Sequence, residues 1–592
     1  MTAPAPASGP VDPFGRDQVA DASGLLGALN RAEVLAAADV HVARTVGRLA
    51  GETDEAVLLA VALAVRAVRL GSSCVELLDV AADLAAETPE VTWPGDDWWA
   101  RVVASPLASG PHRVLVAEEP LLHLARYHGL EVSLCERLAQ RFSLAPPAVD
   151  EDLLAGDLDR LFDDPSFAEQ REAAAHAARG WTSVLTGGPG TGKTTTIARL
   201  LAALATQHAA AGAGRPLDVG LAAPTGKASA RMREAIVGAA AADVFTATER
   251  TWLTGLQAVT VHRLLGPRPD HRTAFRHHAG QKLSHDVVVV DETSMVSLLM
   301  MERLVQAVPE TCRLVLVGDA EQLASVEAGA VLRDVIDGLG GAESRAVTRL
   351  LRGHRFEGAI GELAAAVVEG DVDRAVDVLL AGTDGVALVP PDALAGVVAG
   401  RPAEQARAVG RAAADGDVAG ALRAVGEHRL LCAHRDGPWG VSTWNAELER
   451  EVRTFPDDRQ PWFVGRPVLV TRNDATLGVH NGDVGVTIDD GGRLAVALDT
   501  GRTLAASRIA SAQSAYASTV HRSQGSEFDH VTLLLPDEES LVLTRELLYT
   551  AITRTRSTLT VVGTPDVVRR AVERRTARAS GVARRLRATL GG

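Results

Sequence analysis

The feature that most constrains this chain is a glycine-rich turn, GGPGTGKT, at Gly187–Thr194. A short β-prone run, WTSVLT, precedes it, and an Ala/Leu-rich stretch with helical apolar spacing follows it. A turn of this kind points several backbone N–H groups and a helix N-terminus at one spot, where a phosphate group binds. The sequence therefore predicts an α/β fold built around a phosphate loop.

The turn matches the pattern G-x-x-x-x-G-K-[ST] without a gap. In this pattern Lys193 meets the β- and γ-phosphates of a nucleotide, and the Thr194 hydroxyl is a ligand of Mg²⁺. A Gly/Pro loop without a ligand is the alternative, but the strand and helix around the turn favour a binding loop. The predicted nucleotide-binding residues here are Gly187, Gly188, Pro189, Gly190, Thr191, Gly192, Lys193, Thr194 and Thr195.

The composition indicates a globular protein of several domains. With 592 residues the chain is long enough for about three or four domains. Its hydrophobic content is 46% and its mean hydropathy is +0.07, without an apolar run of membrane-spanning length. The N-terminus lacks the basic and apolar regions of a signal peptide. We therefore expect a cytoplasmic protein with no membrane partner.

Cysteine usage and charge argue against two classes of protein. The four cysteines, Cys74, Cys135, Cys312 and Cys432, form no C-x-x-C pair, so neither a zinc site nor a disulfide framework is supported. A formal charge of −15 argues against a protein that coats nucleic acid without selectivity. A narrow basic groove is still compatible with this charge, because affinity for a phosphate backbone depends on local basic contacts.

The patterns along the chain predict three folded regions after a short tail. Residues 1–20 are rich in Pro, Ala and Gly, and we expect them to be disordered. Residues 21–148 show mainly helical spacing and no catalytic constellation, which is typical of a docking unit. Residues 149–355 contain the phosphate loop and form a first α/β core. Residues 356–592, with the strand-like run RLLCA, form a second core.

Two parts of the second core have patterns of their own. Residues 462–514 read as short strands separated by hairpin-type turns, which predicts a small SH3-like β-barrel inserted in the core. Residues 566–592 are rich in arginine, so we expect a solvated helix, with a DNA or subunit contact as the alternative.

An acidic pair follows a buried strand in the first core. The run DVVVV ends at Val290, and Asp291 and Glu292 come directly after it. At this place in a nucleotide hydrolase, Asp291 holds Mg²⁺ through water, and Glu292 orients and deprotonates the attacking water. Gln322 follows the next buried strand, where a glutamine can sense the γ-phosphate.

Further side chains are candidates for the same site. Gln170 heads a helix shortly before the phosphate loop, where its amide can pair with an adenine edge; an ordinary surface glutamine is the alternative. Arg355 is placed to supply positive charge to the γ-phosphate across a cleft, with Arg349 and Arg352 as competing choices. Arg554 lies on a helix of the second core.

Polar and basic groups at other loops predict contacts with a DNA backbone. Thr225 and Lys227 follow the expected strand 216–223, and Lys227 is one of only three lysines in the chain. A helix cap is the alternative role of Thr225. A basic hairpin that includes Arg276 is expected near residues 266–283. Its histidines have no acidic or cysteine partner at metal-ligand spacing, so we predict no metal there.

This ordered set of motifs resembles the superfamily 1 helicases, in which two RecA-like P-loop NTPase cores clasp one ATP. The motifs that carry the resemblance are, in order, GGPGTGKT, APTGKAS, TVHRLLG, DETSM, GDAEQL, HRF, TVHRSQGSEF and YTAITRTR. The resemblance implies ATP and Mg²⁺ as cofactors, and a motor whose cores close on ATP and open after hydrolysis.

The resemblance also implies roles for individual residues. Arg355 and Arg554 would bracket the γ-phosphate, opposite Lys193, and Glu527 would contact the ribose. On single-stranded DNA, Thr225 and Lys227 would be joined by His262, Arg276, Thr519 and His521.

A narrower likeness is to the RecD family, the alpha subunits of exodeoxyribonuclease V (the RecBCD complex). It rests on TVHRLLG, RHHAG, LLCAHRDGPWGVSTWN, NGDVGV and GSSCVEL. This likeness implies an ATP-dependent 5′→3′ DNA helicase that works in double-strand break repair and recombination. The expected partners are single-stranded DNA, duplex DNA ends, and RecB-like and RecC-like subunits in a heterotrimer. The N-terminal region would dock on the RecC-like subunit, and the nuclease site would lie in a partner.

Two other functions stay open. A stand-alone RecD-like helicase usually carries helix-hairpin-helix repeats in a longer N-terminal region, and the first 150 residues here lack the Gly-rich hairpins of such repeats. A structural subunit with a regulatory ATP site is the other alternative. Such a subunit has no need for the hydrolytic set of Lys193, Asp291, Glu292, Arg355 and Arg554.

Overall fold

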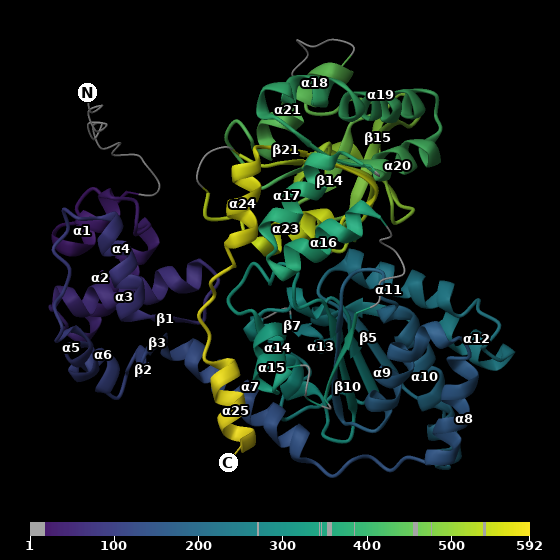
Figure 1. The fold of residues 1–592 in the computed structure, drawn as a ribbon, viewed down its shortest axis with the longest axis horizontal. Helices are drawn as coiled ribbons and strands as arrows, with labels where there is room; N and C mark the ends of the chain where they lie inside the picture. Colours follow the sequence, from purple (N-terminus) through teal and green to yellow (C-terminus); the bar gives the residue numbers. More distant parts are fainter. Residues whose placement is uncertain are drawn as a thin grey trace.

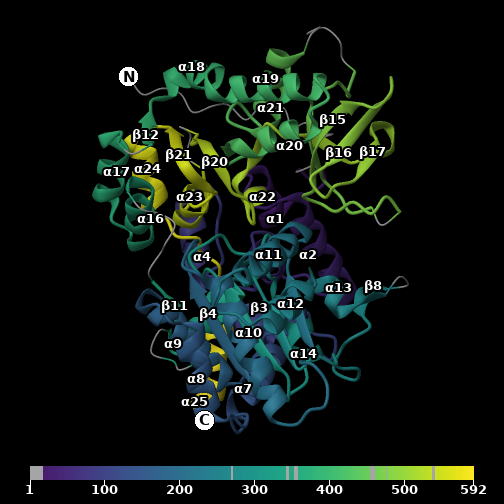
Figure 2. The ribbon, with the colours of Figure 1, turned by 90° about the vertical axis from the view of Figure 1, so that its right-hand side faces the viewer.

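The computed structural model describes residues 18–591 apart from short gaps at 269–270, 342–343, 345, 352–357, 384, 454–459, 475 and 537–539. Of residues 271–273 it describes the backbone alone. Arg352, Arg355 and most of the segment expected to be disordered therefore lie outside the described residues. The described chain forms an N-terminal module, two α/β cores stacked on each other, and a small sheet at the side of the second core (Figures 1 and 2).

The sequence pattern of the N-terminal module suggested helices, but the structure also contains strands there. Its three short strands form an antiparallel sheet in the order β1-β3-β2, covered by helices whose apolar sides share one core. Strands of three or four residues are too short to show a period of their own. The elements are α1 (Gly24–Arg31), α2 (Ala37–Ala50), α3 (Glu55–Arg69), β1 (Cys74–Glu76), α4 (Leu77–Glu87), α5 (Trp98–Ala104), α6 (Pro106–Ser109), β2 (Leu115–Glu118) and β3 (Leu121–Leu124).

The first core is a six-stranded parallel sheet in the order β11-β4-β10-β9-β5-β6. Its central strands are buried along their length because helices cover both faces. Its strands are β4 (Thr182–Gly187), β5 (Val219–Ala223), β6 (Ala258–Thr260), β9 (Val287–Val290), β10 (Arg313–Gly318) and β11 (Val347–Leu350). Its helices are α8 (Glu151–Leu161), α9 (Ala168–Ala178), α10 (Lys193–Ala210), α11 (Gly226–Ala239), α12 (Ala247–Gly255), α13 (Val261–Leu265), α14 (Leu298–Ala307) and α15 (Val331–Gly338).

The basic hairpin expected near residues 266–283 forms at one end of this core. Strands β7 (Pro267–Arg268) and β8 (His271–Phe275) pair in antiparallel fashion. The His262 ring lies against the Phe275 ring with centroids 5.9 Å apart, so the hairpin is held to α13.

The second core is a five-stranded parallel sheet in the order β12-β21-β20-β13-β19. A strand missed in the sequence, β12 (Val386–Val389), forms one edge. The other strands are β13 (His428–Cys432), β19 (Ala517–Thr519), β20 (Phe528–Leu534) and β21 (Thr555–Val562). The helices are α16 (Ala359–Glu369), α17 (Val372–Ala381), α18 (Leu394–Ala399), α19 (Arg401–Ala414), α20 (Val418–Glu427), α21 (Val441–Val452), α22 (Val520–Ser523), α23 (Arg545–Ile552) and α24 (Pro565–Glu573).

An antiparallel sheet is inserted between α21 and β19 of the second core (Figure 2). Its strand order is β17-β16-β15-β14-β18, formed by β14 (Pro467–Val470), β15 (Val484–Asp489), β16 (Leu494–Leu498), β17 (Thr503–Ala505) and β18 (Ala512–Ser514). Helices α19 and α20 pack against it through a shared apolar cluster. The expected strands are therefore present, whereas closure of this sheet into a barrel stays a prediction.

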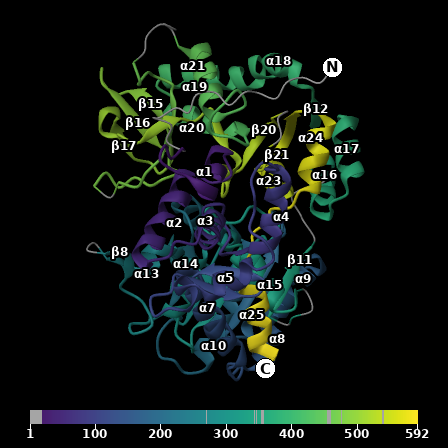
Figure 3. The same cartoon turned by 90° about the vertical axis from the view of Figure 1, so that its left-hand side faces the viewer.

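Two helices pack outside the regions in which the sequence placed them. The apolar side of α7 (Ala125–Ser143) and residues Val582 and Leu586 of α25 (Val582–Gly591) belong to the apolar cluster of the first core. In Figures 1 and 3 the yellow α25 lies beside α7, away from α24. The expectation of a solvated C-terminal helix is therefore wrong, because Val582 and Leu586 are buried against α7 and α15 in the first core.

The segment between α24 and α25, residues 574–581, connects all three bodies. We call it the C-terminal strap. Thr576 bonds to Glu546 of the second core, and Arg578 donates to the Ser325 carbonyl of the first core. The Gly581 N–H donates to the buried Glu131 carboxylate of α7, which also accepts bonds from Ser73 and His123 of the N-terminal module.

Candidate nucleotide site and DNA-facing loops

A cavity of about 600 Å³ lies between the two cores, next to the phosphate loop. It brings together most of the residues that the sequence assigned to the nucleotide. The first core contributes Pro189, Gly190, Gly192, Lys193, Thr194, Thr195, Asp291, Glu292 and Gln322, and the second contributes Glu527 and Arg554. We call this cavity the nucleotide pocket.

The phosphate loop has the backbone that the glycine pattern predicts. Gly190 and Gly192 have φ values of 79° and 84°, which favour glycine because a side chain is strained there. Helix α10 begins at Lys193 and points its N-terminus at the pocket. The Lys193 ammonium donates to the carbonyl oxygens of Gly187 and Gly188, at 2.6 and 2.8 Å. Both acceptors are carbonyl oxygens of the loop itself, so a bound phosphate can replace them as the acceptor of the Lys193 ammonium.

Gln170 lies behind the phosphate loop rather than in the wall of the pocket. Its side chain is buried, and its amide N–H donates to the Thr191 carbonyl at 2.9 Å. This bond supports the loop from below. Contact with an adenine edge therefore stays a prediction. In the structure Gln170 stabilises the phosphate loop through its bond to Thr191.

The acidic pair sits at the carboxyl end of β9, opposite Lys193. Burial, followed by the charge of Glu292, raises the pKa of Asp291 above its ordinary value. Such an environment favours a cation beside the carboxylate, so the residues fit Mg²⁺ with Asp291 and Thr194 as its candidate ligands. Glu292 has a φ of 51°, a strained conformation for a residue with a side chain. Strain of this kind is typical of a functional site.

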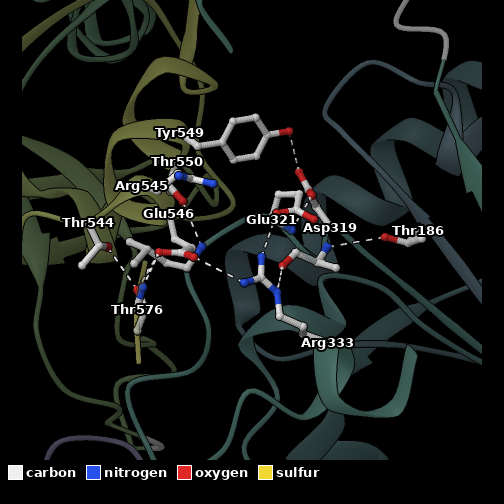
Figure 4. Close-up of polar contacts among 12 residues, drawn as sticks. Thr186, Asp319, Glu321, Arg333, Thr544, Arg545, Glu546, Tyr549, Thr550 and Thr576 are labelled. Atoms are coloured by element: carbon white, nitrogen blue, oxygen red, sulfur yellow. Dashed lines mark hydrogen bonds and ion pairs between the residues drawn. The ribbon is translucent and has the colours of Figure 1, made fainter. Parts of the chain in front are cut away.

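Gln322 is part of a hydrogen-bonded group that joins the cores. Its amide nitrogen donates to Asp319 Oδ2 at 3.1 Å, and the hydroxyl of Tyr549, from the second core, donates to the same oxygen at 3.0 Å. Arg333 bridges Glu321 of the first core and Glu546 of the second, at 2.7 and 3.3 Å (Figure 4). The loop after β10 therefore touches both the pocket and helix α23.

Arg554 reaches the pocket from the second core. Its guanidinium is buried and donates to the carbonyl oxygens of Thr550 and Ser526, each at 3.1 Å. Glu527 lies beside it and pairs with Arg556 at 3.2 Å and with Arg231 of the first core at 3.7 Å. A cross-core ion pair therefore occupies the place where the resemblance put a ribose contact.

Four residues that line the pocket were not predicted from the sequence: Phe167, Arg231, Ala235 and Ala239. Arg231 lies one helical turn after Lys227 on α11, and this spacing was the available signal. Phe167 precedes Gln170 by three residues and is covered by the Arg199 guanidinium, 4.1 Å from the ring centre. Arg349, a competitor of Arg355, lines a neighbouring cavity of about 680 Å³ instead and pairs with Glu321.

The two predicted DNA-facing threonines share one local structure with a third threonine, Thr260. Thr225 lies just after β5, whereas Thr260 and Thr519 are the last residues of β6 and β19, and each caps the next helix by accepting an N–H bond at 3.1 to 3.3 Å. The capping role that was the alternative for Thr225 is thus present. Two of these caps begin the repeated sequence TVHR, at 260–263 and 519–522, which places His262 and His521 at equivalent positions.

The other DNA candidates differ in their surroundings. Thr519 and His521 line a cavity of about 640 Å³ that also holds the basic residues Arg435, Arg466 and Arg522. Arg276 is exposed beside the basic hairpin. Burial, followed by the charges of Arg429 and Arg231, lowers the pKa of Lys227 to about 8.

Within the described part of the chain, every helix is too short or too polar to span a bilayer.

Comparison with known proteins gives matches over three parts of the chain. Residues 31–121 match the family model "RecBCD enzyme subunit RecD, N-terminal domain", residues 170–328 match "AAA domain", and residues 514–562 match "UvrD-like helicase C-terminal domain". Among solved structures, the "Crystal structure of Bacteroides Pif1 bound to ssDNA" is 18% identical, with a TM-score of 0.38, over 68% of this chain and 93% of that chain.

Two curated relatives differ in how much of their own length is matched. The ATP-dependent RecD2 DNA helicase of Deinococcus radiodurans is 33% identical over 68% of this chain, but over only 50% of its own length. The RecBCD enzyme subunit RecD of Mycolicibacterium smegmatis is 49% identical over 94% of this chain and 98% of its own length. This identity over nearly the full length of both chains shows that this protein belongs to the RecD family of RecBCD enzyme subunits.

Proposed function

We propose that the chain is an ATP-hydrolysing 5′→3′ DNA helicase that acts as a subunit of a RecBCD-type helicase–nuclease. The observation that carries this proposal is one pocket with hydrolytic groups from both cores. Lys193, Asp291 and Glu292 come from the first core and Arg554 from the second. Binding and hydrolysis of a nucleotide there can change the distance between the cores, because both cores contact it. A motor requires such a coupling between hydrolysis and movement.

The side chains of the pocket divide the work of hydrolysis. Lys193 leaves its two loop carbonyls and neutralises charge on the β- and γ-phosphates of ATP. Glu292 accepts the proton of the attacking water, and Arg554 supplies positive charge to the transferred phosphoryl group. Mg²⁺, held by Thr194 and Asp291, would add charge neutralisation at the phosphates. On the basis of the sequence alone, we propose Arg355 as a second arginine that supplies positive charge to the γ-phosphate.

The DNA track follows from the capped loops of the two cores. We propose that Thr225 and Lys227 grip the phosphate backbone from the first core, and Thr519 and His521 from the second. His262 and Arg276 extend the track. When the cores close and open, the two grips approach and separate, and the strand advances. A RecB-like and a RecC-like subunit are the proposed partners, in the cytoplasm.

Unwinding of tailed duplexes tests this proposal. The chain alone, and mixed with RecB-like and RecC-like subunits, is given duplexes with a 5′ or a 3′ tail together with ATP. We expect unwinding from the 5′ tail, and a preference for the 3′ tail would contradict the proposal. Lys193→Gln should lower DNA-stimulated ATP turnover by about 100-fold or more while the melting temperature stays unchanged. Turnover near wild type would mean that another loop binds the nucleotide.

A stand-alone helicase is the second candidate. The 33% identity to the ATP-dependent RecD2 DNA helicase of Deinococcus radiodurans favours it, whereas the 49% identity to the RecBCD enzyme subunit RecD of Mycolicibacterium smegmatis favours the subunit. Full unwinding by the lone chain at low concentration would favour the stand-alone enzyme. A chain that binds its partners and DNA but never hydrolyses ATP would favour a structural subunit.

A further inference from the structure

One hydroxyl group of the second core reaches the catalytic loop of the first. Tyr549 on α23 is buried, and its hydroxyl donates to Asp319 Oδ2 at 3.0 Å (Figure 4). Asp319 directly follows β10, and its other oxygen accepts the N–H of Glu321 at 3.0 Å. One oxygen of the carboxylate is therefore fixed by its own loop, and the other by a residue of the second core.

The same carboxylate decides which way the amide of Gln322 faces. Gln322 donates through its amide nitrogen to Asp319 Oδ2, at 3.1 Å. An ionised carboxylate only accepts hydrogen bonds, so the amide NH₂ must face Asp319 and the amide oxygen must face the other way. That oxygen is buried and has no hydrogen-bond partner among the described residues, and Gln322 lines the nucleotide pocket. A buried acceptor without a partner points to a missing donor.

We propose that Tyr549 is a positioning residue: through Asp319 it fixes the Gln322 amide with its oxygen toward the nucleotide pocket, where it accepts a hydrogen bond from the attacking water. This inference rests on the proposed ATP hydrolysis and assigns Gln322 the role of acceptor for water rather than donor to phosphate.

The arrangement links water orientation to docking of the second core. Arg554 bonds to Thr550 of α23, so Tyr549 and Arg554 move as one unit. The Thr550 hydroxyl also accepts the Leu323 N–H of the first-core loop, at 3.0 Å. If the second core moves away, the loop loses Tyr549 at the same time as the pocket loses Arg554. Hydrolysis is then confined to the closed state.

The electrostatics of Asp319 give this role a measurable signature. Burial raises the pKa of Asp319, while the Lys193 charge and hydrogen bonds from Glu321, Tyr549 and Gln322 act in the opposite direction. Removing the Tyr549 hydroxyl takes away one of these bonds and raises the pKa further. Protonated Asp319 no longer forces the amide orientation, so activity must be lost at a higher pH than in the wild type.

Tyr549→Phe tests the inference, with Tyr516→Phe as its matched control. Tyr516 is also a buried tyrosine of the second core, but its hydroxyl has no hydrogen-bond partner among the described residues. DNA-stimulated ATP turnover is measured from acid to neutral pH. For Tyr549→Phe we expect kcat to fall about tenfold, with KM for ATP unchanged and the acidic limb at higher pH. Tyr516→Phe should match the wild type.

A double variant shows whether Tyr549 acts through Gln322. Gln322→Ala should lower kcat, and adding Tyr549→Phe to it should cause no further loss, because the amide to be positioned is gone. Additive losses, or an unshifted acidic limb in Tyr549→Phe, would overturn the inference. An active wild type with an unaffected Tyr549→Phe variant rejects the positioning role alone. A wild type without DNA-stimulated ATP turnover rejects the proposed function.

Discussion

Glu131 gives the sharpest prediction about what holds the three bodies together. Its side chain is fully buried, and its carboxylate accepts bonds from Ser73 Oγ at 2.5 Å, Gly581 N at 3.0 Å and His123 Nε2 at 3.2 Å. Glu131→Leu keeps the volume but removes the acceptor for these donors. Each buried donor that is left without an acceptor costs about 1–3 kcal/mol, so the loss of an acceptor shared by three donors predicts about 4 kcal/mol here.

Hydrogen exchange measures this cost where it arises. A loss of about 4 kcal/mol corresponds to exchange about a thousandfold faster in peptides that cover β3 and the strap. Glu131→Gln is the matched control, because its amide oxygen still accepts from Ser73 and Gly581; its effect should be less than half as large. An acceleration below about tenfold in Glu131→Leu, or equal effects of both variants, would refute the reasoning.

The contacts of Glu131 also predict a dependence on pH. Burial alone raises the pKa of Glu131, but the bonds from His123, Ser73 and Gly581 outweigh it and hold the pKa below the ordinary value of 4.5. A lowered pKa in the folded state means that the ionised carboxylate stabilises the fold above pH 4.5. This contribution is lost as the pH falls through the folded pKa. Hydrogen exchange in the strap, relative to the intrinsic rate at each pH, should therefore become faster on acidification in the wild type but not in Glu131→Leu.

Two further predictions concern DNA affinity and packing. Because the Lys227 pKa is about 8, the affinity of the wild type for single-stranded DNA should fall as the pH rises from about 7 to about 9, and the affinity of Lys227→Gln should not. Lys227→Gln should also reduce the slope of log affinity against log salt concentration by about 0.7. An equal pH response of both proteins would exclude Lys227 as a DNA contact. In urea unfolding, Leu586→Ala on α25 should cost about 2–5 kcal/mol and the half-exposed Leu590→Ala less than about 1 kcal/mol, and equal costs would contradict the packing of α25.

The parts of the site that depend on local pattern were predictable. The phosphate loop needs glycines at fixed spacing between a strand and a helix, and the acidic pair needs a buried strand before it. Both signals lie within about ten residues, and the structure brings Lys193, Asp291, Glu292 and Gln322 into one pocket with Arg554. The order of motifs along the chain then suffices to recognise the family.

The contacts between distant segments could not be predicted in this way. Tyr549 and Asp319 are 230 residues apart, and nothing in the local sequence marks one as the partner of the other. The C-terminal helix was misjudged because its arginines dominate the pattern. Val582 and Leu586, four residues apart, were the signal for a buried face, but two apolar residues in a short helix do not outweigh its charge.

The C-terminal strap restricts how the motor can move. The second core is joined to the first by the chain before α16 and again by residues 574–581, which end in a helix anchored on α7 and α15. Because the strap bonds to the first core through Arg578 and to Glu131 beside the N-terminal module through Gly581, it limits how far the second core can separate from the first. A partner bound to the N-terminal module could change this limit by shifting the anchor of the strap.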